Sequence, residues 1–123
     1  MSVLISILGT GKGTWFEVHK LLEQKLFDSV LLFVDEWAVQ NYRNEYNAIV
    51  VPLATEATSE QLIEVMKHAI KQHMVSQQGE LDIAINISSG TGKQHAALLA
   101  AVMQLGYGIR LVTLENGEFK VLL

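Results

Sequence analysis

The chain has 123 residues, of which half are hydrophobic and 18% are charged, with a formal net charge of −4 and no cysteine. This length predicts one domain over residues 1–123, and the composition excludes a disordered protein. The lack of cysteine excludes a disulfide scaffold and a thiolate metal site or nucleophile, and the acidic balance argues against binding to duplex nucleic acid.

The chain opens with a β-rich apolar run, Val3–Leu8, followed at once by the glycine-rich turn Gly9–Gly13. This start lacks the basic residues and the cleavage site of a signal peptide, and no apolar run reaches the roughly 18 residues that a membrane span needs. We therefore expect a cytoplasmic protein without membrane contact. Thr14 and Glu17 then have the spacing of a capping box, and apolar residues recur at helical spacing as far as Leu26.

Two further strands are predicted at Val30–Val34 and Ala48–Val51, the second closed by the only proline, Pro52. The segment 37–47 between them is polar with scattered aromatic residues, and it predicts at most a short helix.

A clear amphipathic helix is predicted after Thr58, which forms a capping box with Gln61. Gly79 ends this helix, and Leu81–Ile87 predicts the next strand. The apolar stripe of the helix consists of Leu62, Val65, Met66, Ala69, Ile70 and Met74.

The last helix is predicted over 92–105, where Thr91 and Gln94 give a third capping box and Gly106 is placed as the C-cap. This helix is apolar on nearly every face. It therefore needs cover on two sides, by the sheet and by something else, such as a second subunit.

The chain ends in a predicted hairpin, with strands Ile109–Leu114 and Glu118–Leu123 around an Asn116-Gly117 turn. Before the hairpin, strands alternate with helices, which implies a mostly parallel, doubly wound sheet with helices on both faces. The expected fold class is therefore α/β and Rossmann-like, with the hairpin as an antiparallel edge.

The tetrapeptide Gly-Thr-Gly-Lys occurs twice, at Gly9–Lys12 and at Gly90–Lys93, each time after a strand and before a helix. In the usual doubly wound order the first and fourth strands are neighbours, and ligands bind in the crevice between their carboxyl ends. Backbone N–H groups, a helix dipole and a lysine ammonium suit an anion. The repeat predicts a site for a phosphate-bearing ligand; alternatively, the glycines only permit tight turns and the lysines are solvated.

Familiar phosphate motifs fit poorly. A P-loop needs a glycine five residues before the Gly-Lys pair and a hydroxyl residue after it. Those positions hold Ser6 and Gly13 for the first loop, and Ile87 and Gln94 for the second. An ATPase is therefore not expected. The dinucleotide-binding motif G-x-G-x-x-G requires a third glycine where this chain has Thr14. Asp35 nevertheless ends the second strand roughly where such domains have a ribose-binding acid, so a dinucleotide-binding Rossmann domain remains an alternative.

The segment 86–93, Asn-Ile-Ser-Ser-Gly-Thr-Gly-Lys, resembles the N-x-S/T-G-G-T-K signature of CARF domains, the CRISPR-associated Rossmann folds. The opening Val3–Gly11 is similar to the start of many CARF proteins. The order of predicted strands and helices is similar to that of the family along the whole chain, but only these two short motifs are specific to it. The family's paired glycines are here Ser89-Gly90, and Gly92 is inserted between Thr91 and Lys93.

CARF domains typically dimerise and bind a cyclic oligoadenylate, a ring of 3′–5′-linked AMP units, across the twofold axis. The resemblance implies the same here, with cyclic tetra-adenylate as the expected ligand in type III CRISPR signalling. An isologous dimer agrees with this, because it supplies two copies of each loop to a symmetric ring. By the resemblance, the ligand-binding residues are Gly9, Thr10, Gly11 and Lys12 in the first loop, and Ser88, Ser89, Gly90, Thr91, Gly92 and Lys93 in the second.

Most such proteins carry an effector domain, which these 123 residues are not expected to hold. A lone CARF domain can be a ring nuclease, a sponge or the partner of a separate effector protein. Cleavage needs no metal or cofactor, because a ribose 2′-OH can attack the neighbouring 3′-phosphate and leave a 2′,3′-cyclic phosphate. Lys12 and Lys93 would stabilise the phosphorane, with Ser89 or Thr10 as hydroxyl donors. A non-catalytic, nucleotide-binding sensor or regulatory module is the alternative.

A few other residues are candidates. Trp15 follows the first loop and could stack on an adenine or lie in the core. His95 is the only histidine near a loop and could contact a phosphate or simply pack, and the four histidines lack metal-ligand spacing. Asp35, Glu36 and Trp37 leave the second strand at the same edge and could line the pocket, with capping or solvated roles favoured for the two carboxylates.

Overall fold

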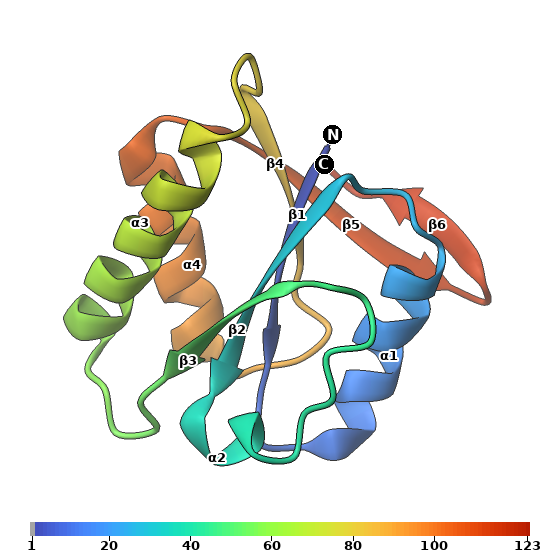
Figure 1. Cartoon of the computed structure of the whole chain (residues 1–123), viewed down its shortest axis with the longest axis horizontal. Helices are drawn as coiled ribbons and strands as arrows, with labels where there is room; N and C mark the ends of the chain where they lie inside the picture. The colour runs from blue at the N-terminus through green and yellow to red at the C-terminus, as the bar shows by residue number, and fades with distance from the viewer. Residues whose placement is uncertain (1) are drawn as a thin grey trace.

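The computed structural model describes residues 2–123, apart from the side chain of Lys12. The strands are β1 Val3–Leu8, β2 Ser29–Asp35, β3 Ile49–Leu53, β4 Asp82–Asn86, β5 Gly108–Glu115 and β6 Glu118–Val121, and the helices are α1 Lys12–Glu23, α2 Glu36–Val39, α3 Ser59–Val75 and α4 Gly92–Leu105. The six strands form one sheet in the order β3-β2-β1-β4-β5-β6 (Figure 1).

All neighbouring strands are parallel except β5 and β6, which form an antiparallel pair. The predicted α/β, Rossmann-like class with a C-terminal hairpin is therefore confirmed. So is the neighbourhood of the first and fourth strands, with Ser6 opposite Asn86 in the register. Beyond β6, backbone hydrogen bonds of Leu111 with Leu122 and Leu123 continue the hairpin pairing.

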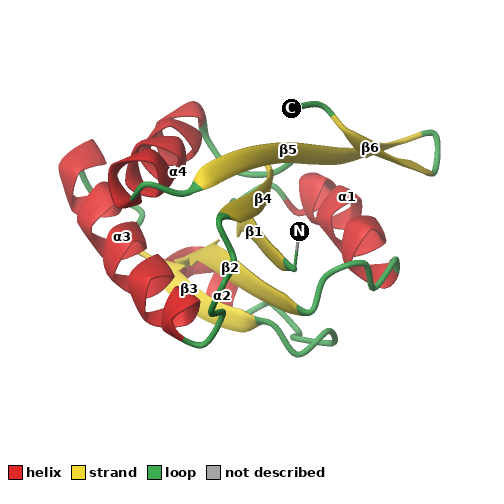
Figure 2. Cartoon of the chain, turned by 90° about the horizontal axis from the view of Figure 1, so that it is seen from above, coloured by secondary structure: helices red, strands yellow, loops and turns green. Residues whose placement is uncertain are grey.

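Helices cover both faces of the sheet (Figure 2). The helices α3 and α4 pack side by side on one face, and α1 covers the other. Strand β1 is buried on both faces, which explains its nearly continuous apolar sequence. Val3, Ile5 and Ile7 belong to the core under α3 and α4, whereas Leu4 and Leu8 belong to the core under α1.

Two of the three predicted capping boxes are confirmed, at Thr58 and at Thr91. The one predicted for Thr14 and Glu17 is wrong. Helix α1 begins earlier, at Lys12, with Gly11 as its N-cap and no side-chain cap among the described residues. The hydroxyl of Thr14 lies instead 2.8 Å from the carbonyl oxygen of Gly11 and 2.8 Å from Oγ of Ser89.

The helix α4 has its inner face on the sheet and α3 beside it. The helix α3 thus covers part of the apolar surface of α4 that the sheet does not cover. Its outward side leaves Ala96 exposed, Leu99 and Ala100 half-buried, and Met103 68% exposed. Within residues 2–123, no helix is both long enough and apolar enough to cross a membrane.

Candidate functional site

Two loops leave the same edge of the sheet at its centre. The first loop, Gly9–Gly11, connects β1 to α1, and the second loop, Ile87–Thr91, connects β4 to α4. Because β1 and β4 are parallel neighbours, their carboxyl ends coincide, and the loops meet as the topology predicts (Figure 1).

The backbones of the two loops touch at Gly9 and Gly90. A Cβ atom on Gly9 would lie 3.1 Å from Cα of Gly90. A Cβ atom on Gly90 would lie 2.8 Å from the buried Ile7 side chain, and Gly90 also has a φ of +107°. By contrast, a Cβ atom on Gly11 or Gly92 would meet nothing within 4 Å. The first glycine of each repeated motif is therefore required for close approach of the loops, and the second is sterically free.

Ser89 joins the loops through a directed set of hydrogen bonds. Its side chain is 1% exposed, and its Oγ accepts from the backbone N–H of Gly9 at 3.0 Å. The same Oγ lies 2.8 Å from Oγ1 of Thr14, which is itself 2.8 Å from the carbonyl of Gly11. Each hydroxyl has one proton, so all three contacts are satisfied when Ser89 donates to Thr14 and Thr14 donates to Gly11. The Ser89 hydroxyl is then fully used inside the protein.

Most other side chains of the second motif are also engaged. Oγ1 of Thr91 accepts from the backbone of Gln94 at 3.1 Å, closing the capping box of α4. Nε2 of His95 lies 2.7 Å from the carbonyl oxygen of Ser89, so the ring holds this loop from the first turn of α4. These contacts make the second motif a well-supported turn with few free donors.

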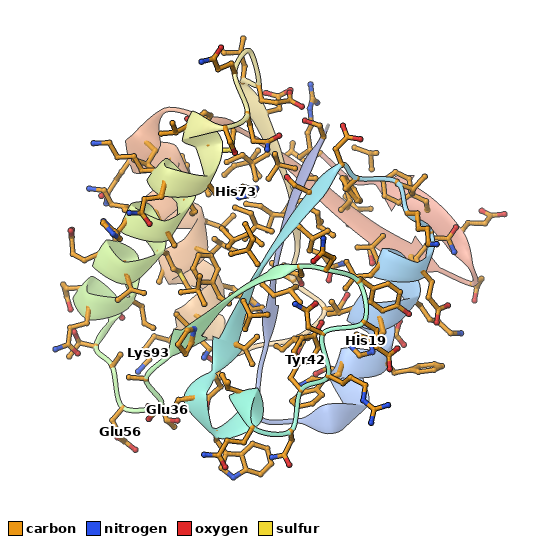
Figure 3. The ribbon with its side chains drawn as sticks, viewed as in Figure 1. His19, Glu36, Tyr42, Glu56, His73 and Lys93 are labelled. Carbon is orange, nitrogen blue, oxygen red and sulfur yellow. The ribbon has the colours of Figure 1, made fainter. Side chains whose placement is uncertain are left out.

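Lys93 points away from the first loop. Its Nζ donates to the carbonyl oxygen of Ala57, at 2.8 Å, in the connection between β3 and α3. Figure 3 shows Lys93 on the side of the edge where Glu36 and Glu56 lie, whereas His19 and Tyr42 lie toward α1. The sequence predicts that two lysines face each other across one crevice, but the structure directs Lys93 toward Ala57 instead. The side chain of Lys12, its predicted counterpart, lies outside the described part of the chain.

The first loop is different, because its helix end is open. Thr10 and Gly11 are exposed, and the first turn of α1 holds no acidic residue. The first backbone N–H groups of a helix lack the usual acceptor one turn earlier. At α1 the N–H of Thr14 reaches the carbonyl oxygen of Gly11 at 3.2 Å, and no described side chain caps the N–H groups before it. This end therefore presents backbone donors and the positive end of the dipole to the solvent.

Trp15 supports the first loop from the protein interior. Its indole N–H donates to the carbonyl oxygen of Gly9 at 2.7 Å, and the side chain is only 8% exposed. The ring of Tyr42 packs edge-on against it, with ring centroids 6.3 Å apart. Burial, with the nearby Tyr46 and Glu45, raises the pKa of Tyr42 to about 12. Trp15 thus occupies the core position that was one of its two predicted roles.

Two carboxylates lie at the carboxyl end of β2, the strand beside β1. Oδ1 of the buried Asp35 accepts from the hydroxyl of Thr55 at 2.8 Å and from the backbone N–H of Trp37 at 3.0 Å. Oε1 of Glu36 accepts from the backbone N–H of Thr55 at 3.1 Å. Both carboxylates therefore cap backbone or hydroxyl groups, while the side chain of Trp37 is 53% exposed.

A hollow of about 230 Å³ lies on the other side of the second loop, between the ends of β4 and β5. The half-buried Ser88 faces this hollow, so the structure separates it from the first loop. Asn86 fixes the hollow's floor, because its amide donates to the carbonyl of Val112 at 2.9 Å and accepts from the N–H of Ser88 at 3.2 Å. The apolar lining comes from Ile85, Ile87, Leu111, Val112 and Leu122. The sequence does not indicate that Leu122 lines this hollow, because only the folded hairpin brings Leu122 to the ends of β4 and β5.

Among residues 2–123, no three histidine or carboxylate side chains are grouped as a metal would need. A scan against models of protein families gave no match for this chain, and a search of curated proteins gave none either.

Proposed function

We propose that this chain binds a cyclic oligoadenylate, with a phosphate at the open amino end of α1, and that it does so as a homodimer. The observation that carries the proposal is the uncapped helix end beside the Gly9–Gly90 contact, at the point where the strand order reverses.

Phosphate binding at this end has a direct physical basis. Free N–H groups at the start of a helix point at the ligand, and the dipole favours a negative charge there. The supporting structure is rigid, since Ser89, Trp15 and the glycine contact hold the first loop from three directions. A site that is ordered before the ligand arrives loses little conformational entropy on binding.

The ring and the dimer are supported by the CARF-like motifs and by exposed apolar residues. Exposed apolar residues lie at two places, the outward side of α4, with Ala96 and Met103, and the region of the hollow, with Ile87 and Leu122. An isologous contact here would bury residues that a monomer leaves in water. Ile87 belongs to the second loop, so such a contact would place the two sites near each other.

Binding has more support than ring cleavage. The hydroxyl of Ser89, one of the predicted donors for cleavage, is buried and engaged with the backbone of Gly9. The ammonium of Lys93 is directed at Ala57. Thr10 is the predicted hydroxyl donor that remains exposed beside the open helix end. A sensor or a sponge therefore fits the arrangement better than a ring nuclease.

The test uses the full chain, cyclic tetra-adenylate and EDTA. Calorimetry measures binding, light scattering measures the mass with and without ligand, and mass spectrometry of the products detects cleavage. We expect a dimer that binds the ring and returns it intact. Linear products with 2′,3′-cyclic phosphate ends would replace the sensor by a ring nuclease. No binding of the four-membered ring, nor of the three- and six-membered rings, would refute the proposal.

A substitution at Gly11 tests the phosphate position itself. Gly11 has the extended conformation of an N-cap residue and open space at its Cβ position. Gly11→Asp should stabilise α1, by about 0.5–1 kcal/mol, through capping and reduced flexibility of the unfolded chain. It should also abolish binding, because its carboxylate takes the place of the phosphate. Gly11→Asn caps the helix without the charge and should retain measurable binding. Equal binding by the aspartate variant and the wild type would place the phosphate elsewhere.

A further inference from the structure

An exposed tryptophan lies in α2, the short helix that follows β2, the strand beside β1. Trp37 is 53% exposed, although tryptophan is a residue that usually buries most of its surface. The chain holds only one other tryptophan, Trp15, and that one is buried under the first loop. An exposed aromatic ring at a ligand-binding edge offers a face on which a nucleobase can stack.

The strand order puts α2, the helix that carries Trp37, at the same sheet edge as the first loop. Leu8, the last residue of β1, is paired with Val34 of β2. Because the two strands are parallel, the first loop, which follows Leu8, and α2, which follows Asp35, leave the sheet at the same edge. Neighbouring strands are about 4.8 Å apart, which puts α2 within reach of a nucleotide whose phosphate lies on α1.

The backbone that carries Trp37 is held in place. Its N–H donates to Oδ1 of Asp35 at 3.0 Å, and Asp35 is in turn bonded to Thr55 at 2.8 Å. These bonds use the main chain of Trp37 and leave its indole ring free of them. The ring can therefore be removed by substitution without breaking the contacts that order the β2 end.

The charges on this side also favour the nucleoside part of a ligand over its phosphate. The carboxylates of Asp35 and Glu36 would repel a phosphate, and Glu36, the exposed one of the two, can accept a hydrogen bond from a ribose hydroxyl. The α1 end carries no acidic residue in its first turn. A nucleotide is thus oriented by charge, with its phosphate toward α1 and its sugar and base toward β2.

We infer that Trp37 is the stacking platform for a base of the bound ligand, an inference that rests on the proposed function. The site then recognises a nucleotide through two separate elements: the backbone donors of α1 take the phosphate, and the indole of Trp37 takes the base. Trp15, the residue that the sequence suggested for stacking, keeps the first loop in position.

The experiment compares Trp37→Ala, Trp37→Phe and wild type in calorimetric titrations with cyclic tetra-adenylate. We expect alanine to weaken binding about 5- to 150-fold, as base–aromatic stacking predicts, and phenylalanine to retain most of the affinity. Phe16→Ala is the matched control, because Phe16 is also an exposed aromatic residue, 61% accessible, and lies further along α1. This control should bind as wild type does.

Fluorescence gives a second readout that does not depend on the alanine variant folding. Ligand should quench the emission of the wild type and leave that of Trp37→Phe, where only Trp15 emits, unchanged. Wild-type affinity in Trp37→Ala, or full quenching in Trp37→Phe, would overturn the stacking inference and leave the proposed function intact. A wild type that binds no ring would overturn both.

Discussion

Replacing Gly90 by alanine should destabilise the protein strongly, whereas the same change two residues later should not. Gly90 has a φ of +107°, and its Cβ position lies 2.8 Å from Ile7, 3.1 Å from His95 and 3.2 Å from Gln94. Gly92 lies in the first turn of α4 with nothing within 4 Å of its Cβ position. The two substitutions are chemically identical and differ only in these surroundings.

The expected size follows from two contributions. A positive φ costs an alanine about 1–2 kcal/mol, and forcing a methyl group into a packed site costs about 1–3 kcal/mol. Reduced flexibility of the unfolded chain offsets this by about 0.4–1 kcal/mol. The net loss for Gly90→Ala is therefore about 3 kcal/mol, while Gly92→Ala should gain about 0.5–1 kcal/mol, as alanine does inside helices.

Urea unfolding followed by circular dichroism measures both effects, and thermal unfolding checks them. For a chain of this length, 1 kcal/mol corresponds to about 4 °C in Tm, so Gly90→Ala should melt about 12 °C below wild type. Gly92→Ala should melt a few degrees above it. Equal stability of the two variants would refute the conclusion that the loops require glycine at position 90 because their backbones touch.

Two further predictions concern single side chains. Ser89→Ala leaves the buried N–H of Gly9 without its acceptor, so it should lower the free energy of unfolding by about 1–3 kcal/mol, as measured with urea. The control Ser88→Ala, at a half-buried neighbour, should lower it by less than about 0.5 kcal/mol. Equal losses in the two variants would contradict the role of Ser89 in linking the loops. Burial lowers the pKa of His73, whose ring lies 3.0 Å from the hydroxyl of Ser29, so the unfolded chain takes up its proton first. The stability that neutral His73 contributes is thus complete above about pH 6.5 and is lost as the pH falls through the folded-state pKa. His73→Gln should therefore make the free energy of unfolding fall less steeply below about pH 6.5. An unchanged slope would show that other groups cause the fall.

The fold was largely predictable because its signals are local. Apolar runs marked the strands, and the Thr58 and Thr91 capping boxes marked two helix starts within a residue. The position of β4 beside β1 followed from the general order of doubly wound sheets. These features need no knowledge of what other side chains do.

The site was predictable only in part, because its details depend on contacts between distant segments. Thr14 has the local spacing of an N-cap, but Ser89, 75 residues away, competes for its hydroxyl. Lys93 reaches Ala57, 36 residues away, and no local pattern encodes that direction. The burial of Trp15 did leave a signal, since Trp15, Val18 and Leu22 share one face of α1.

The contact between Gly9 and Ser89 spans 80 residues and lies between the two central strands. Closing so long a segment costs conformational entropy before any contact repays it, and non-local pairing of this kind slows folding. During synthesis the first loop emerges with β1, but its partner arrives only after β2, β3 and α3 have been made. The edge of the sheet that we assign to the ligand is therefore completed late in synthesis. The ligand accordingly binds chains in which β1 and β4 have already paired.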